Sequence, residues 1–355
     1  MIHVFLGTKA QYIKTAPLLR LMDARGVRYR LIDSGQHAAL SVGLRRELGV
    51  RDPDHVLGDA TDITTVPQAL RWSARLAGRL GSRATLRREV FGGLGGICVV
   101  HGDTPSTFLS TLMAKRAGLR TAHLEAGLRS RSLLHPFPEE LIRLAVMRAS
   151  DVLFAPDAAA VDNLRRLRLR GEIVPVSANT VVEALRHSLA TLPPPSSGPV
   201  AVTMHRVENL KSTARTDRLV DVVRSLDRPV TFVLHGPTAD TFRRRGLDVA
   251  LRSSGVQTVP LLPHAAFTRL LAAAPFVITD GGSVQEECAL LGVPTLLWRR
   301  RTERGDGVGA NVVLSDYDPA VVTRFLANPE ALRGSPPDAG AAPSEQVLES
   351  LLSRL

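Results

Sequence analysis

The sequence predicts an α/β protein built from doubly wound parallel sheets, and three features support that fold class. Short apolar runs alternate with amphipathic stretches of ten or more residues along the whole chain, which is typical of β–α units. Most of the runs are rich in valine, leucine and isoleucine without polar alternation, as strands buried on both faces must be. A length of 355 residues with 44% apolar residues provides material for two domains with separate cores.

The apolar runs are predicted strands, and the amphipathic stretches between them are predicted helices. In chain order the predicted strands are Ile2–Leu6, Ile97–Val100, Thr121–Leu124, Val152–Ala155, Val200–Met204, Val230–Leu234, Thr258–Leu262, Phe276–Thr279 and Pro294–Trp298. A proline-rich cluster, Pro193–Pro199, interrupts the alternation near the middle of the chain. Each side of it is long enough to form its own sheet, so we expect two Rossmann-like halves.

Composition argues against several classes of partner and location. The net charge of +11 comes mostly from arginines spread over predicted helices, and a phosphorylated small substrate would suit that surplus. With only 4% aromatic residues there is no stacking platform for single strands, so no nucleic-acid partner is expected. No stretch approaches the roughly 18 apolar residues of a membrane helix, and Met1–Gly7 lacks the basic region of a signal peptide. Cys98 and Cys288 are predicted buried free thiols, and the protein is predicted to be cytoplasmic.

Acidic residues follow successive elements of the first half. Open α/β sheets bind ligands beyond the carboxyl ends of their strands, so these positions are the first candidates. Asp103 and Glu125 each follow a predicted strand, and Glu139 opens a predicted helix. Asp103 could instead cap the next helix, although Thr104 and Pro105 are the expected cap and first residue. A first-turn glutamate such as Glu139 could be a partner of the helix dipole. Three carboxylates in this order nevertheless suit acid–base chemistry.

Histidines follow two strands of the second half. His205 follows the strand that ends at Met204, and His235 follows the strand that ends at Leu234. Two histidines at the ends of neighbouring strands fit a phosphate or sugar site better than a core. No P-loop, G-x-S-x-G or H-E-x-x-H motif occurs, and the histidines and acids lack metal-ligand spacing, so no metal or cofactor is expected.

A glycine-rich turn opens a helix later in the second half. Gly281 and Gly282 follow a predicted strand and lead into a helix start that could receive a nucleotide. Ser283 and Glu286 match the spacing of a capping box, which would explain Glu286 structurally. Glu287 has no such explanation and is predicted to face the ligand.

Taken together, these motifs resemble the non-hydrolysing UDP-N-acetylglucosamine 2-epimerase family over nearly the whole chain. The matching segments are Gly7-Thr8-Lys9, Lys14–Pro17, Gly35-Gln36-His37, Gly102-Asp103-Thr104, Glu125–Arg129, Pro138-Glu139-Glu140 with Arg143, Asn179-Thr180-Val181, His205-Arg206, Glu208-Asn209, Gln285-Glu286-Glu287 and Thr302-Glu303-Arg304. Each segment alone is weak, but chance does not produce this order and spacing.

Three departures from the family pattern concern substrate detail. Lys9-Ala10-Gln11 stands where the family has Arg-Pro-Glu, so the charge of residue 9 stays but the bidentate fork of arginine is lost. Val207 replaces a common arginine, and Gly281 and Ser283 exchange the positions of a serine and a glycine.

The resemblance implies a GT-B fold, in which two Rossmann-like doubly wound parallel-sheet domains face a cleft. The implied ranges are 1–178 for a first domain that carries the catalytic carboxylates and 179–340 for a second that binds UDP. Residues 341–355 would form a C-terminal helix that packs back towards the first domain. The resemblance also implies a homodimer.

The implied reaction interconverts UDP-GlcNAc and UDP-ManNAc by elimination of UDP to 2-acetamidoglucal and re-addition. The resemblance assigns the chemistry to Asp103, Glu125, Glu139 and His205. Phosphate and sugar would be held by Lys9, Lys14, Arg143 and His235, and uridine by Phe267, Gly282, Ser283 and Glu287. Which acid removes the proton and which returns it stays open. Three rivals also stay open: a hydrolysing 2-epimerase that releases UDP and ManNAc, a GT-B glycosyltransferase with a UDP-sugar donor, and a non-catalytic nucleotide-sugar sensor.

Overall fold

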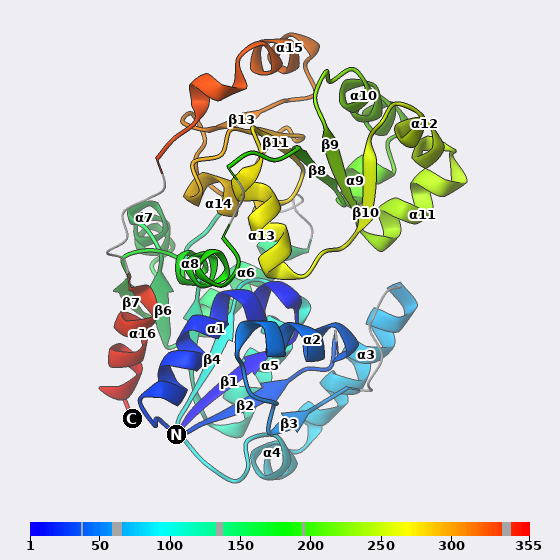
Figure 1. Cartoon of the computed structure of the whole chain (residues 1–355). Coiled ribbons are helices and arrows are strands. Elements are labelled where there is room, and N and C mark those ends of the chain that lie inside the picture. The colour runs from blue at the N-terminus through cyan, green and yellow to red at the C-terminus, as the bar shows by residue number, and fades with distance from the viewer. Residues whose placement is uncertain (37, 59–65, 133–137, 194–195, 336–341) are drawn as a thin grey trace. The chain divides into compact units, whose positions relative to one another are not determined.

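The structure is a computed structural model, and the chain divides into two compact units (Figure 1). It describes residues 1–36, 38–58, 66–132, 138–193, 196–335 and 342–355. Unit 1 comprises residues 1–184 and 340–355, and unit 2 comprises residues 185–339. Within the described ranges, no helix is long and apolar enough to cross a membrane.

Unit 1 contains a seven-stranded sheet, counted over its described residues, in which every paired strand is parallel. The strands are β1 (Ile2–Leu6), β2 (Tyr29–Asp33), β3 (His55–Val56), β4 (Ile97–His101), β5 (Arg120–Leu124), β6 (Val152–Ala155) and β7 (Glu172–Pro175). Their order is β3-β2-β1-β4-β5-β6-β7, so the direction of winding reverses between β1 and β4. Ligands of open α/β sheets bind at such a switch point, beyond the carboxyl ends of the strands.

Helices cover both faces of this sheet because its side chains alternate between two apolar clusters. The helices are α1 (Lys9–Ala24), α2 (Ala38–Leu48), α3 (Val66–Gly78), α4 (Arg83–Thr85), α5 (Pro105–Ala117), α6 (Glu139–Ala149), α7 (Ala158–Leu167), α8 (Val181–Thr191), which continues into unit 2, and α16 (Pro343–Leu352). Ile2, Val4 and Leu6 of β1 pack in the cluster that includes α1, α2 and α16. Phe5, between them in sequence, packs in the opposite cluster with α3, α5 and α6.

The C-terminal helix α16 lies against α1 in unit 1, as Figure 1 shows in red and blue. Val347, Leu348 and Leu351 of α16 are buried, and polar contacts fix both ends of the helix. Near the start of α16, the backbone N–H of Ser344 donates to Glu183 at 3.1 Å, and the Ser344 hydroxyl donates to the same carboxylate. Just beyond its end, Arg354 pairs with Glu172 at the start of β7.

Unit 2 repeats the same architecture with a six-stranded parallel sheet among its described residues. Its strands are β8 (Val200–Met204), β9 (Val230–Leu234), β10 (Gln257–Pro260), β11 (Val277–Thr279), β12 (Thr295–Leu297) and β13 (Val312–Leu314). Its helices are α9 (Val207–Leu210), α10 (Thr213–Arg224), α11 (Gly236–Arg244), α12 (Leu247–Ser253), α13 (His264–Ala273), α14 (Gly282–Leu290) and α15 (Pro319–Ala327). The order β10-β9-β8-β11-β12-β13 places the switch point between β8 and β11.

The core of unit 2 also has two sides. On one face, Phe232, Ile278 and Trp298 pack with α10, α12 and α15. On the other, Val277 packs with residues of α13 and α14. Helices α13 and α14 therefore flank the same face of the sheet, next to the strand that ends at the switch point.

The predicted parallel α/β architecture is confirmed, and each predicted strand overlaps an observed one. The sequence pattern missed β2, β3, β7 and β13. Strand β2 carries Arg30 and ends in Asp33, so its composition is mixed although its apolar residues are buried. Strand β3 has two residues, and β7 is a partly exposed edge strand. Such strands lack the long apolar run that marks a central strand. The prediction of buried free thiols at Cys98 and Cys288 is confirmed.

The docking of α16 provides a stability prediction with an internal control. Leu348 is 0% exposed in the core of unit 1, whereas Leu352 on the same helix is 41% exposed. Leu348→Ala should lower the free energy of unfolding by about 2–5 kcal/mol, because it deletes buried methyl groups and leaves a cavity. Leu352→Ala should change it by no more than about 0.5 kcal/mol. Urea unfolding of both variants tests this, and equal losses would contradict the packing described for α16.

Candidate functional site

The buried side chain of Gln11 ties together the two loops at the switch point of unit 1. Its amide oxygen accepts hydrogen bonds from the backbone N–H groups of Gly7 at 2.8 Å and Thr8 at 3.0 Å, directly after β1. Its amide nitrogen donates to the carbonyl of His101 and to the Thr107 hydroxyl, both at 2.8 Å. Gln11 therefore makes this part of unit 1 rigid, although the sequence analysis treated it only as a departure from the family pattern.

Glu125 lies directly after β5 and is held by a lysine and an asparagine. Lys14 Nζ is 2.5 Å from Glu125 Oε1, and Asn179 Nδ2 donates to the same oxygen at 2.7 Å. The two charged side chains are only 4% and 8% exposed. Glu125 also has a φ of 64°, the left-handed region that non-glycine residues seldom adopt. Several contacts thus hold a strained residue and a buried charge in one place, which is typical of functional sites.

The other oxygen of Glu125 faces the loop after β4. Glu125 Oε2 lies 3.8 Å from His101 Nδ1, and a Cβ placed on Gly102 would be 3.7 Å from it. Gly102 has a φ of 72°, and its carbonyl accepts a hydrogen bond from His123 Nε2 at 2.7 Å. Burial lowers the pKa of His123 to about 4, so this histidine is neutral near pH 7 and orients the loop that carries Asp103.

Asp103 belongs to a chain of alternating charges. It pairs with Arg143 on α6, whose other nitrogen is 2.5 Å from Glu140 Oε2. Glu140 also pairs with Arg129 and accepts the backbone N–H of Ser130 at 3.1 Å. Burial alone would raise the pKa of Glu140, but Arg129, the Ser130 amide and Arg143 together hold it below its usual value. Glu140 therefore anchors Arg143 next to Asp103.

The structure shows which residues begin helices α5 and α6. Thr104 is the N-cap of α5 and Pro105 is its first residue, as predicted, so Asp103 is not the cap. Glu139 is the first residue of α6 and is half-buried. Pro136 and Phe137, which the sequence analysis placed before this helix, lie outside the described residues. Glu140 was missed, although its spacing of three residues from Arg143 is a signal for an ion pair on one helix face.

His205 follows β8 in unit 2, and the buried Asp280 after β11 organises the loop around it. Asp280 accepts the backbone N–H groups of His205 at 2.9 Å and Arg206 at 3.0 Å, and the side chain of Asn209 at 2.9 Å. The rings of His205 and His235 stack with centroids 4.6 Å apart. Burial lowers the pKa of His205, and the Asp280 carboxylate only partly opposes that shift. The prediction that the two histidines lie on neighbouring strands is confirmed.

The start of α14 is closely packed because it is made of glycines. A Cβ on Gly281 would lie 2.8 Å from His205 Cε1, and one on Gly282 would lie 2.9 Å from Glu303 Oε1. Neither contact is sterically possible without movement. Glycine at both positions therefore lets the backbone at this helix start approach the residues that follow β8 and β12.

The predicted capping box at Ser283 and Glu286 is wrong. The helix begins earlier than the pattern suggested, with Gly281 as an N-cap that has no side chain. Ser283 is therefore inside the first turn and exposed. Glu286 is buried within the helix, and its Oε2 is 3.0 Å from Arg304 Nη1. Glu286 consequently anchors the loop that contains Arg304.

Arginines surround the start of α14. Glu303 Oε2 is 2.9 Å from Arg299 Nη2, and Glu303 Oε1 is 3.3 Å from Arg206 Nη2. Burial would raise the pKa of Glu303, but Arg299, Arg206 and Arg304 hold it at about 2. These arginines are paired with Glu303 and Glu286, and they lie beside a helix N-terminus whose backbone N–H groups suit an anionic ligand group.

Glu287 and Phe267 lie on the neighbouring helices α14 and α13. Glu287 is buried, and its Oε1 is 3.8 Å from His264 Nε2. Phe267 is partly buried against an apolar cluster that includes Leu271 and Val284. Phe267 thus contributes to the core of unit 2 while it stays partly exposed.

The structure brings the predicted residues of each half together around that half's switch point. In unit 1 these are Lys14, Asp103, Glu125 and Arg143, with Lys9 and Glu139 at the first positions of α1 and α6. In unit 2 they are His205 and His235, which follow β8 and β9, and Gly282, Ser283, Glu287 and Phe267 on α14 and α13. His37 of the Gly35-Gln36-His37 motif lies outside the described residues. Over the described ranges, no group of three His, Cys, Asp or Glu side chains could hold a metal ion.

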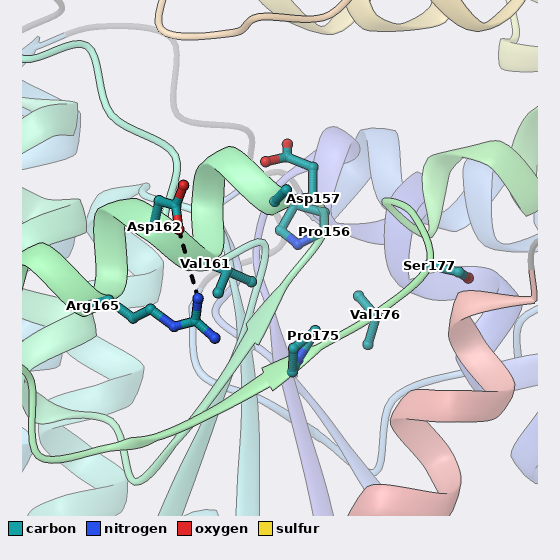
Figure 2. A pocket seen from close by; sticks show the side chains of 9 residues that line it. Pro156, Asp157, Val161, Asp162, Arg165, Pro175, Val176 and Ser177 are labelled. Atoms are coloured by element: carbon teal, nitrogen blue, oxygen red, sulfur yellow. Dashed lines mark ion pairs between the residues drawn. The ribbon is translucent and has the colours of Figure 1, made fainter.

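A hollow of about 530 Å³ on unit 1 was not predicted (Figure 2). Its lining residues are Pro156, Asp157, Ala158, Val161, Asp162, Arg165, Pro175, Val176 and Ser177. Asp157 is engaged as the N-cap of α7, and Asp162 pairs with Arg165 at 3.7 Å. These polar groups interact within α7 and do not converge on a ligand. The hollow therefore offers fewer groups for catalysis than the residues around Glu125.

Known proteins provide an independent comparison. The family model for UDP-N-acetylglucosamine 2-epimerase matches residues 20–331. A UDP-N-acetylglucosamine 2-epimerase of Methanocaldococcus jannaschii is 27% identical over 338 residues, which cover 89% of this chain and 88% of that relative. A UDP-2,3-diacetamido-2,3-dideoxy-D-glucuronate 2-epimerase of Pseudomonas aeruginosa is 28% identical over 330 residues, with 88% of each covered.

Solved structures agree on the fold. A crystal structure of the Methanocaldococcus jannaschii enzyme in complex with UDP-GlcNAc and UDP covers 99% of both chains with a TM-score of 0.83 at 24% identity. Sucrose-phosphate synthase of Thermosynechococcus elongatus matches with a TM-score of 0.58 at 14% identity, over 100% of this chain and 95% of that one. The predicted GT-B class, with two Rossmann-like parallel sheets, is confirmed. With a family model that spans most of its length, the chain belongs to the UDP-N-acetylglucosamine 2-epimerase family.

Proposed function

We propose that the chain is a non-hydrolysing UDP-N-acetylglucosamine 2-epimerase that interconverts UDP-GlcNAc and UDP-ManNAc. The observation that carries this proposal is the buried Glu125, held by Lys14 and Asn179 beside the loop of Asp103. Carboxylates fixed in this way at the end of a sheet suit proton transfer to and from carbon. The related enzymes and the family model support the same reaction.

Inversion at C2 requires a carbon–hydrogen bond to be broken although that hydrogen is not acidic. In the proposed mechanism a base removes the C2 proton, the C1–oxygen bond breaks, and UDP departs with its electron pair, leaving 2-acetamidoglucal. In the return direction UDP attacks C1, and C2 receives a proton on the opposite face. The reaction is redox-neutral overall, and two protein groups on opposite sides of the sugar are sufficient to carry the proton.

The residues of unit 1 are proposed to handle these protons. Asp103, Glu125 and Glu139 are the candidates, and Arg143 holds Asp103 in position. Lys14 compensates the buried charge of Glu125, so its first role is to keep this carboxylate in place. Lys9, at the first position of α1, is proposed to contact phosphate.

The residues of unit 2 are proposed to hold UDP. The glycine start of α14, with Ser283 in its first turn, would receive phosphate oxygens beside the arginines around Glu303. His205 would assist departure of UDP, and His235, stacked on it, would fix its ring. Phe267 and Glu287 would contact the uracil and the ribose hydroxyls.

A second substrate deserves a direct test. The Pseudomonas aeruginosa relative, named for a diacetamido-glucuronate substrate, is as similar to this chain as the enzymes named for UDP-GlcNAc. Incubation with each UDP-sugar separately, followed by proton NMR, decides between them. We also propose that the enzyme is a cytoplasmic homodimer. Light scattering of the purified protein measures its molar mass and so tests the dimer.

The first prediction from the proposed function concerns the carboxylates. Asp103→Asn and Glu125→Gln should each lower turnover on the order of 10²-fold or more, because each removes a proton-transferring or charge-bearing group. The matched control is Asp162→Asn, since Asp162 in the same unit has a side chain that is 60% exposed. A steady-state assay with UDP-GlcNAc measures all three variants. A near wild-type rate for Asp103→Asn or Glu125→Gln would make that residue structural.

The second prediction concerns the nucleotide. Glu287→Ala should weaken UDP binding by about 1.5–3 kcal/mol, the range for hydrogen bonds to a charged group. Glu330→Ala is the control in the same unit, because the Glu330 side chain is 57% exposed. Calorimetric titration with UDP provides the affinities. Unchanged affinity in a folded Glu287→Ala variant would remove Glu287 from the UDP site.

The third prediction separates the epimerase from a hydrolase. In D₂O, UDP-GlcNAc should be converted to UDP-ManNAc with deuterium at C2, and UDP with glucal should accumulate only slowly. The intermediate is retained because re-addition by bound UDP has a high effective concentration. Proton NMR of the mixture shows both products, and free ManNAc that rises together with UDP would establish the hydrolysing reaction instead.

A further inference from the structure

Three polar side chains from three helices form a buried row in unit 2. Ser188 on α8, His264 on α13 and Glu287 on α14 are 4%, 2% and 5% exposed. The distance from Ser188 Oγ to His264 Nδ1 is 3.2 Å, and the distance from His264 Nε2 to Glu287 Oε1 is 3.8 Å. Neither Ser188 nor His264 has a part in the proposed chemistry, so the burial of this row requires its own explanation.

Two atoms of the row have no hydrogen-bond partner among the described residues. They are His264 Nε2 and Glu287 Oε2, and both are buried. A buried polar atom without a partner costs free energy, and most buried polar atoms in proteins therefore have one. An open carboxylate oxygen at this depth is suited to accept hydrogen bonds from a bound molecule.

The row has the order of a serine–histidine–acid triad, but its geometry does not suit a nucleophile. Ser188 lies in the interior of α8 and is buried, so its hydroxyl cannot reach a substrate. The separation of 3.8 Å between His264 and Glu287 is also longer than a hydrogen bond. Ser188 and His264 can therefore influence the position of Glu287, but they do not take part in a covalent step.

Charge determines which tautomer of the His264 imidazole is favoured in this row. A neutral imidazole carries one proton, on either Nδ1 or Nε2. A proton on Nε2 points at the carboxylate of Glu287, and the Ser188 hydroxyl can then donate to Nδ1. The opposite tautomer would place a nitrogen lone pair against the carboxylate, which is unfavourable.

We propose that His264 is a positioning residue that determines nucleotide specificity, because it holds Glu287 where both ribose hydroxyls of a nucleoside diphosphate can donate to it. This inference rests on the proposed function, in which Glu287 contacts the ribose. Ser188 fixes the imidazole, the Nε2–H group attracts Glu287 Oε1, and Oε2 stays available. A carboxylate held in this way discriminates against a ligand that lacks one hydroxyl, since a buried acceptor is then left unpaired.

The test compares UDP with 2′-deoxy-UDP by calorimetry on the full-length chain. Wild type should prefer UDP by about 10-fold or more, as expected for one hydrogen bond to a charged group. His264→Leu removes both ring nitrogens and should lower this preference to about 2-fold, mainly through weaker UDP binding. His264→Gln, which keeps an N–H group near the position of Nε2, should restore most of the preference. A merely structural role would weaken both ligands equally.

Three further outcomes complete the test. If Glu287→Gln abolishes the preference while His264→Leu and His264→Gln both retain it, the positioning role of His264 is overturned. If Glu287→Gln also retains it, the contact between Glu287 and ribose is absent, and that part of the proposed function fails. If His264→Leu does not fold, Ser188→Ala takes its place: a lowered preference supports the proposal, and a wild-type preference overturns it.

Discussion

The buried ion pair between Lys14 and Glu125 is the constraint on which the site of unit 1 depends. Two charges at this depth are costly unless they compensate one another, and removal of one partner typically costs about 3–5 kcal/mol. The pair joins α1 to the end of β5, and Asn179 adds a contact from just before α8. Segments far apart in the sequence therefore meet around Glu125, whose backbone lies in the left-handed region. The position of the Glu125 carboxylate therefore depends on contacts from several elements of unit 1.

The same principle organises unit 2 around a different acid. Asp280 is fully buried, and its carboxylate collects the backbone N–H groups of the loop after β8. This contact joins the ends of β8 and β11, the two strands at the switch point. That contact holds the backbone of His205, and Gly281, which follows Asp280, leaves room for the imidazole ring. Asp280 thus has a structural role: its carboxylate positions the candidate catalytic residue His205.

The departures from the family pattern also have a physical interpretation. Gln11 stands where the family has a glutamate. Its amide group both donates and accepts hydrogen bonds and therefore links two loops, whereas a carboxylate could only accept. Glycine at position 281 removes a clash with His205, and the exposed Ser283 in the first turn of α14 keeps a hydroxyl near the same helix start.

The sequence by itself determined the parallel α/β class, the central strands and the loops that carry chemistry. Apolar runs such as Val200–Met204 indicate buried strands locally, and the position of Asp103, Glu125 or His205 after a strand is visible from neighbouring residues alone. The short and edge strands were not visible, because their burial depends on neighbours in the sheet. Only the tertiary structure decided which charges pair. Glu140 anchors Arg143, and Glu286 pairs with Arg304 instead of forming the predicted capping box with Ser283, because ion pairs depend on distances between segments that the order of residues does not specify.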